Sequence, residues 1–293
     1  MGIVSYELGT FEKIYETINH SEDFRLSDSE KNICRFCGET DINKFKSKAH
    51  VVPEFTGARI LYKCECDSCN NLFSKYERDL SLFGGIKNII SGVKGKKFPK
   101  HIDRDNKFYA QSNKERVFQI FSQGENDGIK IQNGQLELSS MTQKFRPRFV
   151  QKALVKIGMS LMPQEELYKF SKTLEWLAVP QDNFSIDKHP MSLLLEREVS
   201  VPQKKPLAIL SRRTLPQNSP EYFLLFFYSF FAYQLSIPFN ENDTKLDYSN
   251  LSYPISKGVV VDFHKPTGVK FNHYYMSSLK SVQIEDKFRS KLK

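Results

Sequence analysis

Four cysteines in two closely spaced pairs are the residues of this sequence best suited to chemistry. Cys34 and Cys37 belong to the motif CRFC, and Cys66 and Cys69 belong to the motif CDSC. Two Cys-x-x-Cys motifs are typical of a tetrahedral structural zinc site, because this spacing lets both sulfurs of a motif turn toward one ion. The sequence therefore predicts one zinc ion held by four thiolates, and this ion would fold a stretch too small to build its own core.

The distribution of the cysteines favours metal binding over disulfide bonds. All five cysteines lie between positions 34 and 69 of the 293-residue chain, whereas a disulfide framework would be spread along a secreted chain. The first residues, MGIVSYELGT, lack the basic and apolar regions of a secretory signal. We therefore expect a cytoplasmic protein. The fifth cysteine, Cys64, competes for the site through a Cys-x-Cys pair with Cys66, a spacing that suits a zinc knuckle less well.

The composition is that of a folded and basic protein. Hydrophobic residues make up 40% of the chain and the net charge is +9, so the chain can bury a core and its surface suits polyanions. Charge alone leaves a basic protein without a nucleic-acid role equally open. The longest apolar run, residues 222–237, contains Gln234 and is shorter than the ~20 residues of a membrane-spanning helix. We therefore expect no membrane partner.

The segments around the cysteines are predicted to form two strands and a helix. The extended segments INKFKSKAH, which ends at His50, and ARILYKCE flank a loop, and a helix is predicted from about Cys69 to Leu82. The apolar side of this helix consists of Leu72, Phe73, Tyr76 and Leu80. The opposite side presents the oxygen atoms of Asn70 and Glu77, so one face packs on a core while the other offers metal ligands.

This arrangement resembles the HNH endonuclease family, whose fold is a ββα-metal module. Family members often carry the pattern CxxC…HxxP…CxxCN, which appears here as CRFC, HVVP and CDSCN within residues 32–83. The resemblance implies that His50 is the general base that activates water, a role that suits a side chain with a pKa near neutrality. It also implies that a divalent ion, Mg²⁺ or Mn²⁺, holds the scissile phosphate of DNA.

The sequence departs from the family pattern beside the base. The residue before the family's histidine usually binds the catalytic ion, and here it is Ala49, which cannot. Asn70 matches the family's later ligand, so an acidic ligand must come from elsewhere. We assign this role to Glu77, which shares a helix face with Asn70 although about two turns separate them. Glu54 is the alternative ligand, since Mg²⁺ retains several waters and needs few protein ligands.

The remainder of the chain is predicted to form a second domain. Residues 91–100 are rich in lysine and glycine and suggest a basic linker. Beyond it, the patterns predict a hairpin at Asn133-Gly134, helices over 148–161 and 163–177, and strands at 207–210, 222–237 and 258–264. A short helix is also predicted within residues 5–18. We therefore expect an α+β protein with a nuclease domain over 1–104 and an α+β domain over 105–293.

Two functions from different classes follow from these patterns. The first is a metal-dependent endonuclease of bacterial defence or of a mobile element, in which the domain over 105–293 responds to an activating ligand, binds a partner protein or assembles a homo-oligomer. The second is a zinc-stabilised nucleic-acid-binding or adaptor protein without catalysis, which Ala49 favours. The association of an appended domain with defence is an analogy with the family rather than a property of these residues.

Overall fold

A computed structural model describes most of the chain. The longer described stretches are residues 33–102, 144–180, 193–215 and 218–246. Shorter described segments cover residues 4–5, 15–21, 108–113, 118–122, 129–132, 135–141, 252–253, 259–262 and 271–276. The described residues contain both helices and antiparallel sheets, so the predicted α+β class is confirmed at this level.

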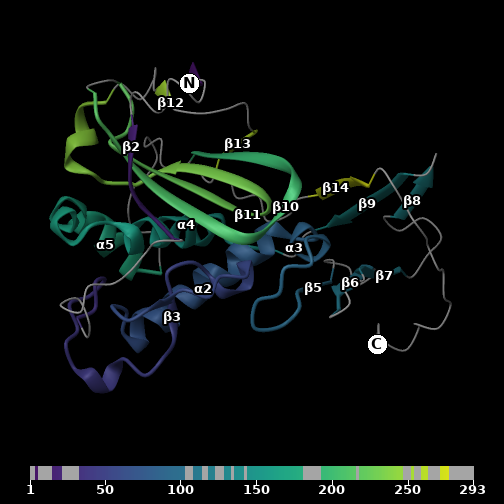
Figure 1. The fold of residues 1–293 in the computed structure, drawn as a ribbon, viewed down its shortest axis with the longest axis horizontal. Helices are drawn as coiled ribbons and strands as arrows, with labels where there is room; N and C mark the ends of the chain where they lie inside the picture. The colour runs from purple at the N-terminus through teal and green to yellow at the C-terminus, as the bar shows by residue number, and fades with distance from the viewer. Residues whose placement is uncertain are drawn as a thin grey trace.

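A four-stranded antiparallel sheet and one buried helix form the centre of the fold (Figure 1). The sheet has the order β11-β10-β13, and β2 also pairs with β10. The strands are β2 (Tyr15–His20), β10 (Leu193–Arg213), β11 (Tyr222–Ser236) and β13 (Val259–Asp262). Helix α4 (Pro147–Leu161) packs against β10 and β11 on one side and against α2 (Asp67–Gly84) on the other. Every residue of α4 from Phe149 to Leu161 is buried.

The predicted strand–strand–helix order is present in the cysteine-containing part. Strands β3 (Ala49–His50) and β4 (Leu61–Tyr62) pair antiparallel, and His50 lies opposite Leu61. Between them runs the short helix η3 (Glu54–Thr56), and η2 (Ile42–Lys44) precedes β3. Helix α2 begins directly after Cys66, and its buried face includes Phe73, Tyr76 and Leu80 as the periodicity predicts. The two strands are shorter than the extended segments expected from the sequence.

One buried cluster extends across the predicted domain boundary near residue 104. Tyr76 of α2 donates a hydrogen bond to the Leu177 carbonyl at 2.9 Å, and its ring lies 4.6 Å from that of Phe149 on α4. The same core contains buried residues of the knuckles, of α2, of α4 and of β11. The division into domains over 1–104 and 105–293 stays a prediction. The two predicted domains would have to share this buried core.

The segment predicted as a basic linker is partly built into the fold. Helix α3 (Lys87–Ile90) precedes it, and β5 (Lys100–Ile102) begins at its end and pairs with β6 (Phe108–Ser112), which pairs with β7 (Phe118–Ser122). Gly95 is buried, and a Cβ atom there would lie 2.7 Å from the Glu54 carbonyl oxygen. A glycine is needed because the segment passes so close to the η3 backbone.

Most of the other predicted elements are found, with one error. Strands β8 (Ile129–Gln132) and β9 (Gln135–Met141) form the predicted hairpin, whose turn residues lie outside the described residues, and β9 also pairs with β14 (Phe271–Met276). Helices η4 (Gln164–Phe170) and α5 (Ser171–Ala178) cover the predicted helix after Pro163. Strands β1 (Val4–Ser5) and β12 (Ser252–Tyr253) pair in parallel.

The predicted helix within residues 5–18 is wrong over its described part. Residues from Tyr15 to His20 form strand β2, which hydrogen-bonds along residues Ile209–Arg213 of β10. The edge of the long strand β10 forms hydrogen bonds with the backbone N–H and C=O groups of β2. This pairing outweighs the weak helical periodicity of the segment. In the part of the chain that the structure describes, no helix combines the length and the apolar character needed to cross a membrane.

Candidate active site and four-cysteine metal centre

The four predicted cysteines converge on one point of the structure. The sulfur atoms of Cys34, Cys37, Cys66 and Cys69 all lie within 4.8 Å of one another. The Sγ atoms of Cys37 and Cys66 are 3.6 Å apart, and the Cys66 amide donates to the Cys34 sulfur at 3.4 Å. Four sulfurs at this spacing form a donor set for one tetrahedral ion, which fits zinc. Cys64 is buried outside this group, so Cys66 rather than Cys64 completes the cluster.

The local backbone explains how the knuckles form. Gly38 has a φ of 74°, which favours glycine, and its amide donates to the Cys34 carbonyl at 2.8 Å to close the first knuckle. The second knuckle merges with the first turn of α2, where the Asn70 amide donates to the Cys66 carbonyl at 2.9 Å. A hydrogen bond involving Cys69 lowers the pKa of Cys34 to about 4, and the same interaction raises the pKa of Cys69. The thiols share protons that a bound divalent ion would displace.

His50 lies at the end of β3, half-buried, beside the loop that contains Glu54. Burial lowers the pKa of His50, the cations Lys156 and Arg59 lower it further, and the carboxylate of Glu54 opposes them. The imidazole is therefore favoured in its neutral form, which can accept a proton.

A buried lysine from α4 sits between the parts of this site. The Nζ atom of Lys156 lies 3.0 Å from Glu65 Oε2 and 3.8 Å from Glu77 Oε1, and it donates a hydrogen bond to the His50 carbonyl. The side chains of Lys156 and Glu65 are 1% and 0% exposed. Burial raises the pKa of Glu65, against the opposing effect of Lys156. Burial followed by the charges of Glu65 and Glu54 raises the pKa of Glu77 to about 7, again opposed by Lys156.

The predicted catalytic residues are only partly brought together. Glu54 interacts electrostatically with His50 and with Glu77, and it also pairs with Arg59 at 3.7 Å. Among the described residues, no hydrogen bond joins the side chain of Asn70 to this group. Seven helical positions separate Asn70 from Glu77, an axial distance of ~10 Å. The structure thus places His50 and Glu77 each within electrostatic reach of Glu54 and leaves Asn70 nearer the cysteine cluster, while the catalytic roles of these residues stay predictions.

The carboxylates fit a water-rich divalent ion rather than a closed metal cage. Within the described ranges, the cysteine cluster is the one group of three or more His, Cys, Asp or Glu residues whose ligand atoms all lie close together. Mg²⁺ commonly uses one or two carboxylates and keeps several waters, so a cage is not required. Glu77 is 24% exposed on its side chain, and burial raises its pKa, with Lys156 opposing and the charges of Glu65 and Glu54 adding to the effect.

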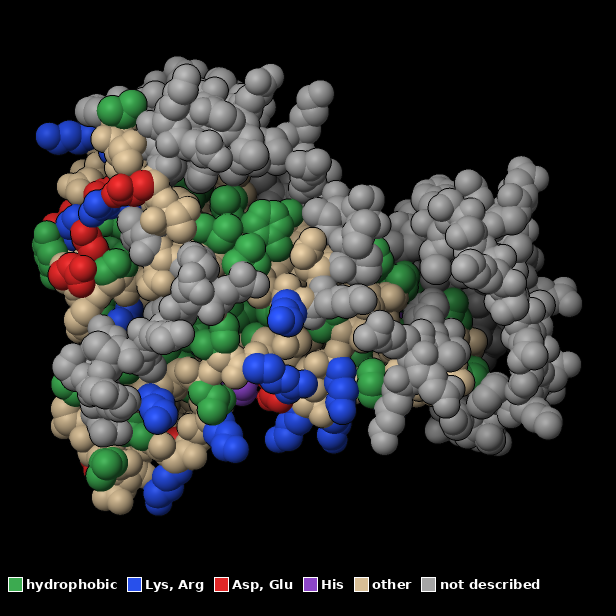
Figure 2. All heavy atoms as spheres, viewed as in Figure 1, with side chains coloured by type: hydrophobic (Ala, Val, Ile, Leu, Met, Phe, Trp, Pro, Cys, Tyr) green, Lys and Arg blue, Asp and Glu red, His purple; other side chains and the backbone are tan. Residues whose placement is uncertain are grey.

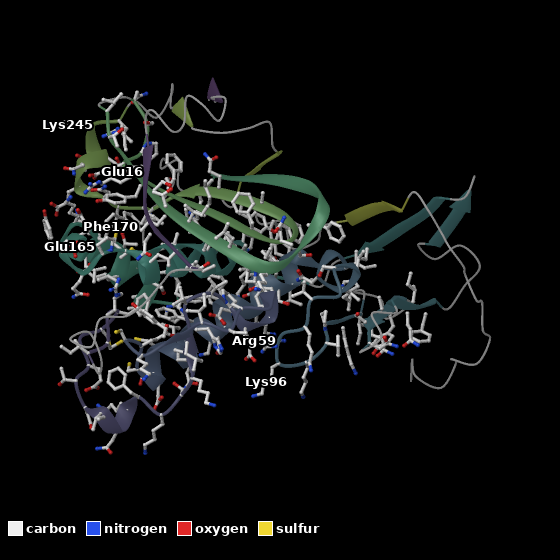
Figure 3. All side chains as sticks on the ribbon, viewed as in Figure 1. Glu16, Arg59, Lys96, Glu165, Phe170 and Lys245 are labelled. Carbon is white, nitrogen blue, oxygen red and sulfur yellow. The ribbon has the colours of Figure 1, made fainter. Side chains whose placement is uncertain are left out.

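Basic side chains surround the opening of the site. Figure 2 shows Lys and Arg side chains gathered around acidic and histidine side chains on one face of the molecule. The exposed lysines Lys94, Lys96 and Lys97 flank the buried Gly95, which contacts the Glu54 backbone. Figure 3 shows Arg59 and Lys96 on the same side of α2, with Lys245 toward the opposite end of the molecule. From the sequence, a solvated linker and a contact with DNA are equally compatible with these lysines.

A pocket of about 240 Å³ lies along the β3–β4 hairpin. Lys46, Lys48 and Lys63 border it, and all three are exposed. Positive charge on a concave surface next to the base is suited to a phosphate backbone, which is bound through charge rather than base sequence.

Two residues of the site were missed by the analysis of the sequence. Glu65 lies between Cys64 and Cys66, and the cysteines are the residues that this motif identifies as metal ligands. Lys156 follows Lys152 by four residues, and such a pair on an amphipathic helix is normally solvated. The apolar character of the rest of the helix indicates that Lys156 is buried, because α4 is buried on all sides.

Compared with known proteins, the chain matches no family model, no curated protein and no solved structure.

Proposed function

We propose that this protein is a metal-dependent endonuclease of the HNH type that hydrolyses phosphodiester bonds in DNA. The observation that carries the proposal is the position of His50. It lies on the short hairpin that precedes the cysteine-anchored helix, within electrostatic reach of Glu54, and its carbonyl contacts the same Lys156 ammonium group as Glu77. A base in neutral form, carboxylates and a lysine-rich rim are the groups that phosphodiester hydrolysis on a polyanion needs.

The chemistry assigned to the protein's own residues begins with His50. Burial favours the neutral imidazole, whose unprotonated ring nitrogen would take a proton from water. The water oxygen then adds to phosphorus while the bond to the 3′ oxygen breaks, which leaves 5′-phosphate and 3′-hydroxyl ends as in the family. Glu77, with Asn70 or Glu54, would hold Mg²⁺ or Mn²⁺, which supplies charge stabilisation at the phosphate and the leaving oxygen.

The second metal in the proposal is a structural zinc ion in the four-cysteine cluster. It would fix the first knuckle against the start of α2, so that β3 and α2 keep their relative positions. The first knuckle is also held from outside, because Arg35 donates hydrogen bonds to the carbonyls of Met159 and Met162 at the end of α4. The cluster and α4 thus support the same small hairpin and helix.

Glu77→Gln is expected to raise the Mg²⁺ concentration needed for half-maximal cleavage by about 10-fold or more, because an amide is a weaker ligand for a hard cation than a carboxylate. Glu54→Gln serves as the matched control, since Glu54 is already paired with Arg59. The measurement is cleavage of plasmid DNA over a Mg²⁺ titration. If Glu54→Gln shows the larger shift, Glu54 is the ligand and the assignment of Glu77 is wrong.

Replacing Lys94, Lys96 and Lys97 by glutamine is expected to weaken DNA binding and to flatten its salt dependence. Each lost phosphate contact should reduce the slope of log affinity against log salt by about 0.9. The control replaces three other exposed lysines, Lys172, Lys205 and Lys245, and so removes the same charge. Equal effects of the two sets, measured by fluorescence anisotropy with labelled duplex DNA, would show that net charge rather than this rim binds DNA.

The alternative function is a zinc-stabilised nucleic-acid-binding or adaptor protein without catalysis. Ala49 favours it, because this buried alanine offers no metal ligand beside the base. Incubation of the purified protein with plasmid DNA and Mg²⁺ or Mn²⁺, with and without EDTA, separates the two. We assign the residues beyond 104 to control of the nuclease through an activating ligand, a partner protein or self-association.

A further inference from the structure

The surroundings of Lys156 are unusual for a helix residue outside the catalytic motif. Its side chain is 1% exposed, and its ammonium group faces three oxygen atoms from three different segments. These are the carbonyl of His50 on β3, Glu65 Oε2 in the second knuckle and Glu77 Oε1 on α2. The His50 carbonyl accepts a hydrogen bond from this ammonium group, whereas Glu65 at 3.0 Å and Glu77 at 3.8 Å are its ion-pair partners.

The charge arrangement explains why a lysine is tolerated at this depth. A buried ion is unfavourable unless it is paired and hydrogen-bonded. Glu65, with its side chain wholly buried, supplies the close partner at 3.0 Å, while Glu77 at 3.8 Å is looser and partly exposed. Lys156 therefore neutralises Glu65 within the core and leaves Glu77 with one oxygen turned toward it and an open side toward solvent.

We propose that Lys156 is a positioning residue of the nuclease site, which holds the backbone of His50 and the carboxylate of Glu77 in the arrangement that a divalent ion and the phosphate require. This inference rests on the proposed function. Carboxylates that bind metal ions are commonly oriented by a further hydrogen-bonding group, and loss of such a group lowers metal affinity. Here that group comes from α4, far along the chain from the motif.

The position of Lys156 is itself set by the central sheet. Two residues beyond it, Gly158 packs so closely against Ile237 that a Cβ atom would collide with the Ile237 side chain. Helix α4 also contacts β10 and β11 directly. Helix α4 contacts the sheet on one face and His50 on the other. Residues beyond 104 therefore contact the site directly. It follows that residues 1–104 alone lack a group that the site uses.

The test compares the variant K156M/E65Q with K152M and with K156R. The double change removes both buried charges together, because K156M alone would strand the Glu65 carboxylate and destabilise the fold. Lys152 is the matched control. It is a buried lysine one turn earlier on α4, and its ammonium donates to the Trp176 carbonyl at 2.8 Å rather than to the site. Each protein is measured for zinc content, thermal unfolding, Mn²⁺ affinity by electron paramagnetic resonance, and the kinetics of DNA cleavage.

For K156M/E65Q we expect full zinc content, a Mn²⁺ affinity lowered by about 10–100-fold and a similar fall in kcat, with KM for DNA unchanged. K156R should recover part of both, whereas K152M should lose thermal stability and keep both. Unchanged Mn²⁺ affinity and kcat in K156M/E65Q would overturn the role of Lys156. Cleavage of DNA by the wild type would still support the proposed function in that case.

The reverse separation is also measurable. If the wild type does not cleave DNA, the proposed function fails, yet a drop in Mn²⁺ affinity confined to K156M/E65Q would still support Lys156 as the residue that positions Glu77. If the wild type does not cleave DNA and its Mn²⁺ affinity is no higher than that of the Glu77→Gln variant, both the proposed function and the role of Lys156 are overturned.

Discussion

Replacing any one of Cys34, Cys37, Cys66 or Cys69 by serine is expected to remove zinc and to unfold residues 33–84. The reason is that the binding energy of a structural zinc ion, about 10–16 kcal/mol in small zinc-binding peptides, is also folding energy. Three thiolates and a hydroxyl bind zinc far less well, because serine is neither ionised nor soft. The measurements are elemental analysis of the freshly purified protein and thermal unfolding followed by circular dichroism.

Cys64→Ser is the matched control for this experiment. Cys64 is buried next to the cluster but contributes no sulfur to it, so the variant should keep its zinc and lose only the packing of one thiol. The prediction fails if the wild type contains no zinc, or if Cys66→Ser retains a full complement. In the second case, Cys64 would have taken over as the fourth ligand.

His50→Ala is expected to lower the rate constant for DNA cleavage by about 10²–10⁴-fold, the usual contribution of a general base. Zinc content and thermal stability should stay near those of the wild type. The imidazole is only half-buried, and Lys156 binds the backbone carbonyl of residue 50, which the variant retains. The measurement is single-turnover cleavage at saturating Mg²⁺. Cleavage at the wild-type rate would place the base elsewhere, and joint loss of zinc and activity would make His50 a structural residue.

The pH dependence of cleavage provides a second measurement on the same base. Burial, assisted by Lys156 and Arg59, lowers the pKa of His50 below its ordinary value of 6.5. Only the neutral imidazole accepts a proton, so the rate should rise with pH through the lowered pKa and should fall as the pH drops below it. Arg59→Gln removes one of the nearby cations and should move this acidic limb to higher pH. A limb that stays in place would show that Arg59 does not act on His50.

The parts of the site that could be predicted are those that depend on neighbours in sequence. The spacing of the cysteines identifies the cluster, because two residues between thiols set the geometry of a knuckle whatever surrounds it. The face of α2 that carries Phe73, Tyr76 and Leu80 follows from a period of 3.6 residues. His50 stands at the end of a hairpin whose two strands are close in sequence.

The parts that could not be predicted depend on contacts between distant segments. The pairing of Lys156 with Glu65 and Glu77 requires α4 to cross α2 at one particular place, and no local pattern encodes that crossing. The same limit explains the error over residues 15–20, whose structure is decided by the edge of β10. The lysines near Gly95 resemble a linker in sequence, and the close approach of Gly95 to the Glu54 backbone arises from tertiary packing.

The late position of the central sheet in the chain has a consequence for synthesis on the ribosome. The motif that contains His50 and the cysteines emerges first, whereas α4 can pack fully only after β10 and β11 have been made. Translation of the segment from Gly84 to Ser236 takes on the order of ten seconds at bacterial rates. In the later part of that interval the nascent chain already contains Lys156, but α4 still lacks the strands against which it packs. Under the proposed function, the site is complete only after β10 and β11 have been made, which limits cleavage by shorter nascent chains.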